Sequence, residues 1–416
     1  DTLTGRRDVL SPLEDVLQLG FAASHINVRL VSRLASLALG AAVDVADTSE
    51  RLRGATMDSA TVDSAMNSES PVALRSDVIG TQPWLWDGFI GVVNGVVGDH
   101  LAASNNPLAM PMQLRFRGSY GAPEDIAAQL LSSAVASSAG GAAPPLKRQR
   151  VAVFVHGLTA TEWSWALDAA NQHGSPSATF ATMLHADLGI EPVFVRYNSG
   201  RHISENGQDL SASLQRLVSA VTPESLELIL VGHSMGGLVT HSAVHAATHD
   251  QPATWPSAVS HVITLGTPHE GAPLEKFGQL AERVLGAIDL PATRIPAEVI
   301  GARSAGIKDL RYGHLVAADW QATARGHAHP RTPLQRIAGA QYHRVVGTLT
   351  ADPNHPVGQV VGDALVRPDS AAATGLVAEA PGEVERLGDV SHIALTNHAR
   401  VYALLRAWLT PTTDER

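Results

Sequence analysis

The residues of this sequence best suited to chemistry are Gly232-His233-Ser234-Met235-Gly236-Gly237. The apolar run Leu226 to Val231 precedes them and predicts a buried strand, and apolar residues at helical spacing follow them. A Gly-x-Ser-x-Gly turn between a strand and a helix strains the serine backbone and exposes its hydroxyl. The pattern therefore predicts a nucleophilic Ser234. The alternative is a glycine-rich turn whose serine has no chemical role.

A serine becomes a nucleophile only when a base takes its proton and a third group orients that base. N–H donors must also meet the negative oxygen that forms on the substrate. The predicted strand Val151 to Val155 ends in His156-Gly157-Leu158. At this point the chain resembles the α/β-hydrolase lipases and esterases, in which a His-Gly dipeptide ends an early strand. The resemblance implies that the Leu158 and Met235 amides form the oxyanion hole, while His156 braces the loop.

The same resemblance points to the acid of a catalytic triad. Many lipases of this superfamily carry a Gly-Asp-Gly-Leu-Val stretch with the triad acid at the aspartate. This chain has Gly362-Asp363-Ala364-Leu365-Val366, so Ala364 replaces the second glycine. Asp363 is the expected acid. Asp352, which lies nearer the end of the preceding strand, is the alternative.

The base is expected on the loop that enters the last helix, where the resemblance places it. His392 lies there, directly before the helical pattern of Val401, Leu404 and Trp408. His398 is the alternative, but it falls inside the helical pattern and would point along a fixed face. The chain order of the triad is then Ser234, Asp363 and His392.

Three further stretches are similar to a bacterial lipase and esterase branch that resembles GPI inositol-deacylases. They are Leu265 to Gly271, Arg196 to Gly200, and Ser304 to Leu310. The resemblance covers residues 112–271 and 342–416 together with 304–310. These motifs are specific for the fold and for serine chemistry, and they do not identify the substrate.

The elements that must position these residues alternate along the chain. Helical patterns such as Leu210 to Val221 and Leu238 to Ala247 separate the strand-like runs, and fully apolar strands are typical of a parallel sheet covered on both faces. We therefore expect the α/β class: an α/β-hydrolase fold with a mostly parallel sheet and helices on both faces. The expected strands cover residues 112–117, 151–155, 192–197, 226–231, 259–265 and 342–347.

We expect four segments in this chain: an N-terminal helical extension (1–111), a first part of the core (112–271), an inserted helical lid (272–341) and a second part of the core (342–416). The lid is expected from the apolar stripe between Leu274 and Ile288, because insertions there lie over the strand ends where ligands bind. The extension is expected to pack on the core, with a homodimer contact and peripheral membrane contact as alternatives. Only Arg29 and Arg33 are basic between Leu13 and Leu39, which disfavours a membrane surface.

Composition narrows the function further. The chain has 416 residues, a formal net charge of −10 and no cysteine, which argues against nucleic-acid binding and excludes disulfides and thiolate catalysis. No transmembrane span is expected. The compartment stays open, with the cytoplasm slightly favoured; because the sequence begins at Asp1, it neither indicates nor excludes a removed leader.

The 19 histidines invite a metal interpretation. His241, His245 and His249 recur every four residues, but about 12 Å of helix separates the outer two, too far for one ion. His327 and His329 lie in a polar loop. We expect neither a metal nor a cofactor.

Together these patterns predict a serine carboxylic-ester hydrolase, a lipase or esterase, that works through an acyl-enzyme. The expected substrates are small-molecule or lipid esters with an apolar acyl group, polyesters included. An acyltransferase or a thioesterase would use the same triad, and a non-catalytic binding scaffold is the alternative from another class.

Overall fold

One eight-stranded sheet organises the chain, in the order β2-β1-β4-β3-β5-β6-β7-β8. The structure, a computed structural model, describes residues 82–137, 148–221, 225–272, 304–326, 332–373 and 383–411. From β4 to β8 all neighbouring strands are parallel, whereas β1 is antiparallel to both β2 and β4. The strands are β1 (Gln113–Phe116), β2 (Ser119–Gly121), β3 (Gln149–Val155), β4 (Glu191–Arg196), β5 (Leu226–His233), β6 (Val259–Leu265), β7 (Gln341–Gly347) and β8 (Glu383–Leu387).

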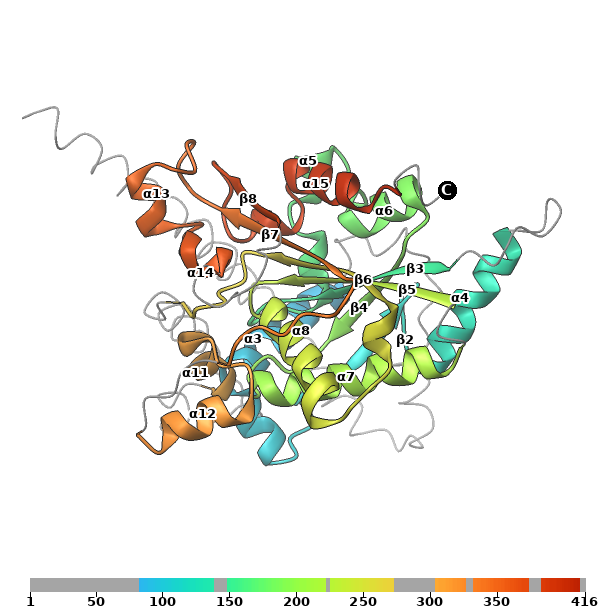
Figure 1. Cartoon of the computed structure of the whole chain (residues 1–416), viewed down its shortest axis with the longest axis horizontal. Coiled ribbons are helices and arrows are strands. Elements are labelled where there is room, and N and C mark those ends of the chain that lie inside the picture. Colours follow the sequence, from blue (N-terminus) through green and yellow to red (C-terminus); the bar gives the residue numbers. More distant parts are fainter. Residues whose placement is uncertain are drawn as a thin grey trace, which may run out of the picture.

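Helices cover both faces of this sheet, with α6 and α15 on one side and α7 and α8 on the other (Figure 1). The α-helices are α3 (Gln82–Ala103), α4 (Pro123–Ser137), α5 (Ala169–His173), α6 (Phe180–Leu188), α7 (Ile203–Ser219), α8 (Met235–His245), α11 (Ala305–Tyr312), α12 (Ala317–Ala324), α13 (Pro356–Val361), α14 (Pro368–Ala372) and α15 (Ala399–Leu409). Short 3-10 turns are η2 (Glu162–Ala166), η5 (Trp255–Ala258) and η7 (Ala394–Thr396), and η4 (Ala246–Asp250) is a π-helical turn.

The central strand β5 shows why the strands are apolar on both faces. Leu228 and Leu230 pack into the core formed with α7 and α8. Ile229 and Val231, which alternate with them, pack into the core formed with α6 and α15. All four side chains are fully buried, and each contributes about 1.5–3 kcal/mol of hydrophobic stabilisation. Burial on both faces therefore explains the continuous apolar run.

The strand register brings four loops to one edge of the sheet. Val155 of β3 pairs with Gly232 of β5, which pairs with Thr264 of β6. Leu265, the last residue of β6, pairs with Val345 of β7. Because these strands are parallel, the loops that follow them emerge side by side. This edge is where open α/β sheets bind ligands.

The expected fold class is confirmed by this architecture. All six expected strands are present within one or two residues of their expected ends. The short strands β2 and β8, at the two edges of the sheet, were not expected. Of the expected N-terminal extension, α3 is described. Its side chains Ile90, Val93 and Leu101 form a small cluster with Met110 that is separate from the two sheet cores, and the helix contacts α11 and η2.

Some expectations lie outside the described residues. They are the amphipathic helices between Leu13 and Leu39, with the dimer or membrane contact expected of them, the apolar stripe from Leu274 to Ile288, and the pair His327 and His329. Across the described ranges, no helix combines the length and the apolar character that crossing a bilayer requires.

Candidate active site

Ser234 occupies the turn between β5 and α8. Its backbone has φ 54° and ψ −125°, a conformation that costs a non-glycine residue on the order of 1–3 kcal/mol. The Ser234 N–H donates to the Leu265 carbonyl (2.9 Å), and the Gly237 N–H donates to the Ser234 carbonyl (3.1 Å). A Cβ atom on Gly232 would lie 2.6 Å from the Gly237 Cα, so this close turn requires glycine. The chain forms the strained strand-to-helix turn that its motif predicts.

Asp363 and His392 meet beside this turn. The His392 Nδ1 lies 2.7 Å from the Asp363 Oδ2, and the His392 backbone N–H donates to the Asp363 carbonyl (2.9 Å). Both side chains are buried. A Cβ on Gly266 would lie 3.1 Å from each of the two bonded atoms. The preceding residue, Leu265, holds the Ser234 backbone. The segment Leu265-Gly266 therefore contacts both the acid–base pair and the serine turn.

Backbone amides hold the Asp363 carboxylate in place. Its Oδ1 accepts hydrogen bonds from the N–H groups of Leu365 (3.1 Å) and Val366 (2.8 Å), which leaves Oδ2 for His392. The intervening Ala364 has a φ of 89°, a left-handed conformation that glycine adopts with less strain. The replacement of the second glycine by Ala364 therefore places strain in the loop that carries the acid.

The two alternative residues have other partners. Asp352 is exposed, and its Oδ1 accepts from the backbone N–H two residues further on. The Nδ1 of His398 accepts from the backbone N–H of Arg400 (3.2 Å), so His398 caps the N-terminus of α15. It therefore precedes the helix, and the expectation that it lies inside the helical segment is wrong. The structure brings together Asp363 and His392.

His233, the residue before Ser234, links the serine turn to the loop of His392. Its Nε2–H donates to the His392 carbonyl (2.9 Å), and the two ring centroids are 4.7 Å apart. Burial lowers the pKa of His233 to about 3, so the ring is neutral at physiological pH. Sequence reasoning missed this residue. Its signal was a histidine at the variable position of the Gly-x-Ser-x-Gly turn.

Within the described residues, the Ser234 hydroxyl makes no hydrogen bond to His392. Such bonds are often long in an enzyme without substrate and shorten when substrate binds. With Nδ1 of His392 donating to Asp363, the Nε2 atom is the one that can accept a proton.

The loop that follows β3, residues 156–161 (the β3 loop), passes directly over Ser234. A Cβ on Gly157 would lie 3.1 Å from the Ser234 Cβ. Among the described residues, neither the Leu158 N–H nor the Met235 N–H has a hydrogen-bond acceptor. Met235 is the first residue of α8, where helical N–H groups have no partner within the helix. Two backbone donors therefore flank the serine, at a helix end that favours negative charge.

His156 holds the shape of the β3 loop. Its Nδ1–H donates to the Gly157 carbonyl (2.9 Å), and its Nε2 accepts from the Tyr197 N–H (3.4 Å). The ring also stacks on that of Tyr197, with centroids 4.3 Å apart. Burial lowers the pKa of His156 to about 4. These contacts fit a bracing role.

The three regularly spaced histidines do not form one group in the structure. His241 is buried, and its ring lies 5.1 Å from that of His269. α8 ends at His245, and the rings of His245 and His249 stack at 4.4 Å across the π-helical turn. Across the described ranges, no three His, Cys, Asp or Glu side chains gather as metal ligands would.

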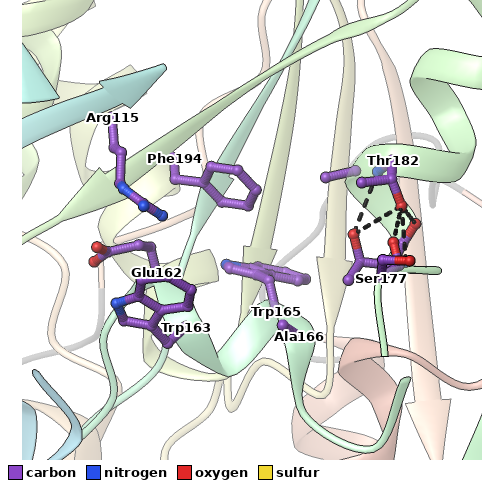
Figure 2. A pocket seen from close by; sticks show the side chains of 10 residues that line it. Arg115, Glu162, Trp163, Trp165, Ala166, Ser177, Thr182 and Phe194 are labelled. Atoms are coloured by element: carbon purple, nitrogen blue, oxygen red, sulfur yellow. Dashed lines mark hydrogen bonds between the residues drawn. The ribbon is translucent and has the colours of Figure 1, made fainter. Parts of the chain in front are cut away.

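Figure 2 shows a small pocket lined by aromatic and polar side chains. Trp163, Trp165 and Phe194 form aromatic walls, and Arg115 and Glu162 lie at one end. The Trp165 ring lies 6.2 Å from the ring of His233, in an edge-to-face arrangement. The pocket thus neighbours the serine turn, but its walls include none of the three expected triad residues.

The sheet order, the helices on both faces and the strained serine turn define the α/β-hydrolase fold. Residues 181–322, about a third of the chain, match the PGAP1-like alpha/beta domain. This match confirms the family resemblance that the sequence motifs indicate. No curated protein matches this chain by sequence.

Several solved structures are similar to this chain. The Bacillus licheniformis lipase BlEst2 in mature form is 20% identical with a TM-score of 0.40, over 66% of this chain and 97% of the lipase. Phospholipase PlaB from Legionella pneumophila is 16% identical with a TM-score of 0.40, over 65% of this chain and 61% of PlaB. A soluble variant of monoglyceride lipase from Saccharomyces cerevisiae is 14% identical with a TM-score of 0.38, over 64% and 88%. Likeness at this level carries no argument about function, which must come from the site.

Proposed function

We propose that this chain is a serine carboxylic-ester hydrolase that works through Ser234, His392 and Asp363. One observation supports this most: a buried histidine–carboxylate hydrogen bond of 2.7 Å lies beside a serine in a strained strand-to-helix turn. A serine, a base and a group that orients the base are the parts that nucleophilic acyl transfer requires.

In the proposed first step, Ser234 Oγ attacks the ester carbonyl while His392 Nε2 takes the hydroxyl proton. Asp363 keeps the opposite nitrogen, Nδ1, protonated and stabilises the imidazolium that forms. The neutral His233 places no positive charge beside that imidazolium. The new C–O bond converts the carbonyl oxygen into an oxyanion.

The Leu158 and Met235 N–H groups are the proposed donors to this oxyanion. Each lacks an acceptor among the described residues, and both flank Ser234. Removing one such donor from an acyl-transfer enzyme typically lowers kcat about 10²- to 10³-fold. The tetrahedral intermediate then collapses, and the leaving alcohol takes the proton from His392. Water attacks the acyl-enzyme by the same route in reverse and releases the acid.

We also propose that the insertion, residues 272–341, covers this site and that the substrate carries an apolar acyl group. The described helix α11 supports the first point. A Cβ on Gly306 would lie 3.0 Å from the Met235 Cε, and the Gly306 N–H donates to the Gly200 carbonyl (2.9 Å). The proposed acyl preference rests on the apolar stripe between Leu274 and Ile288.

Replacing the nucleophile tests the proposal. We expect Ser234→Ala to lower hydrolysis of p-nitrophenyl butyrate by about 10⁴-fold or more, because no acyl-enzyme can form. Thermal unfolding should change little, since the alanine lacks only the hydroxyl. Release of p-nitrophenol and a melting curve of each protein provide the measurement.

Ser132→Ala is the matched control, because Ser132 is an exposed serine on α4. It should keep wild-type activity. Retained turnover in Ser234→Ala would refute the proposed function. Adding glycerol to the same reaction and identifying the acyl product separates hydrolysis from acyl transfer. A hydrolase would release the free acid, whereas a transferase would form the glycerol ester.

A further inference from the structure

Helix α3 packs directly on the loops that flank the proposed active site. It lies beside α11 (Figure 1), and the Ser304 hydroxyl donates to the carbonyl of Gly95 within it (2.7 Å). Near its start, Asp87 Oδ2 accepts from the Trp163 indole N–H (2.7 Å). Near its end, the Asn198 side-chain amide donates to the Gly98 carbonyl (2.8 Å). The helix is therefore fixed at both ends against the core.

Between these anchors, two glycines let α3 approach the β3 loop very closely. A Cβ on Gly95 would lie 2.8 Å from both the backbone N and the Cα of Thr159. A Cβ on Gly91 would lie 3.0 Å from the carbonyl carbon and oxygen of Ala160. The Gly95 distance is shorter than real Cβ contacts, and the Gly91 distance is at their lower limit, so a methyl group at either position would move the loop or the helix.

The backbone of Thr159, the residue closest to Gly95 in the β3 loop, is itself strained. Thr159 has a φ of 60°, which a β-branched residue rarely adopts. On the side of the core, its N–H donates to the Ser199 hydroxyl (3.1 Å). Thr159 is thus held between α3 and Ser199, and it directly follows Leu158, the proposed oxyanion donor.

We infer that α3 and Ser199 clamp the β3 loop, with Gly95 as the positioning residue that sets the direction of the Leu158 N–H. This inference rests on the proposed function. An oxyanion donor must lie 2.7–3.1 Å from the developing charge, and a misplacement of about 1 Å can cost about 10²-fold in rate. A methyl group at Gly95 would push on the residue next to the donor.

Gly88, on the same helix, provides a control position. A Cβ on Gly88 would have no atom within 4 Å. Gly88→Ala therefore adds the same methyl group to the same helix without contact, and alanine favours the helix. Gly91→Ala places a methyl group against Ala160, which is two residues from Leu158. The three variants form a series of decreasing distance from the proposed donor.

We would measure kcat, KM and the inhibition constant of a trifluoromethyl ketone, which forms a hemiketal oxyanion on the serine. Rates are normalised to the sites that a fluorophosphonate titrates. We expect Gly95→Ala to lower kcat about 10- to 100-fold and to raise the inhibition constant of the ketone in proportion. The KM should change less than about threefold. Gly91→Ala should show a smaller effect of the same kind, and Gly88→Ala none.

A structural role alone would lower the melting temperature of Gly95→Ala and leave the normalised kcat and the ketone affinity at wild-type values, which would overturn the clamp. If Gly95→Ala does not fold, Ser199→Ala tests the other side: unchanged kcat and ketone affinity would refute the clamp, and parallel losses would support it. Absence of turnover in the wild-type protein would instead refute the proposed function.

Discussion

Two pairs of buried side chains include histidine, and the pairs differ in whether a carboxylate is bonded to the ring. In the first pair, His392 is hydrogen-bonded to the carboxylate of Asp363. In the second, His241 and His269 lie together near the Arg344 guanidinium. No carboxylate is bonded to His241 or His269 among the described residues.

The charged group beside each buried histidine affects the pKa of its ring. Burial, with the positive charge of Arg344, lowers the pKa of His241 to about 3 and that of His269 well below its usual value. Such rings stay neutral and cannot take up a proton near neutral pH. A carboxylate partner stabilises the protonated form of an imidazole. The number of buried histidines therefore says little about catalysis. His392 is distinguished by a carboxylate partner combined with a position beside the serine turn, since His314 is also buried and lies 3.3 Å from a carboxylate, that of Asp309.

The largest expected effect comes from removing the charge of that carboxylate. Asp363→Asn should lower kcat by about 10⁴-fold. The asparagine Oδ1 can still accept from Leu365 and Val366, which turns its amide N–H groups toward His392 and favours the wrong tautomer. Ester hydrolysis measured under saturating substrate checks this.

Asp352→Asn is the matched control at the alternative acid. Because Asp352 is exposed and caps a turn, its variant should keep kcat within about twofold of wild type, as surface substitutions usually do. A reversed outcome, with Asp352→Asn inactive and Asp363→Asn active, would assign the acid to Asp352.

A smaller effect, on stability rather than rate, is expected at His241. Its pKa is about 3 in the folded chain and about 6.5 when unfolded, so unfolding takes up a proton between these values. The stability contribution of the neutral ring is present above pH 6.5 and is lost as the pH falls. His241→Leu should reduce the slope of unfolding free energy against pH, between pH 6 and 4, by up to about 1.4 kcal/mol per pH unit.

Urea titrations of wild type and His241→Leu across this range provide the slopes. The variant should also hydrolyse esters within about twofold of the wild-type rate, because His241 touches none of the proposed triad residues. An unchanged slope would contradict the pKa argument. A loss of activity comparable to that of Asp363→Asn would abolish the contrast between the two pairs.

The central strands could be predicted because burial on both faces leaves a continuous apolar run. The edge strand β8 could not: Glu383, Glu385 and Arg386 interrupt its sequence, and most of its residues are only half-buried. An edge strand of this kind is specified by its pairing with β7 rather than by its own pattern. β2 is only three residues long and carries no periodicity.

At the site, Ser234 could be predicted because its motif encodes a local turn. Asp363 and His392 came from resemblance, since 29 residues separate them and spacing alone does not bring them together. The strain at Ala364 and the contact between Gly95 and Thr159 could not be predicted. Both depend on how distant backbone segments pack, which neither periodicity nor composition records.

The central claim is that Ser234 is a nucleophile activated by His392. Its most direct test is the mass of the intact protein after reaction with a fluorophosphonate, followed by peptide mapping of the adduct. We predict one adduct per chain, on Ser234, formed at least about 10³-fold more slowly in His392→Ala. An unmodified wild-type protein, or an adduct on another residue, would contradict the claim.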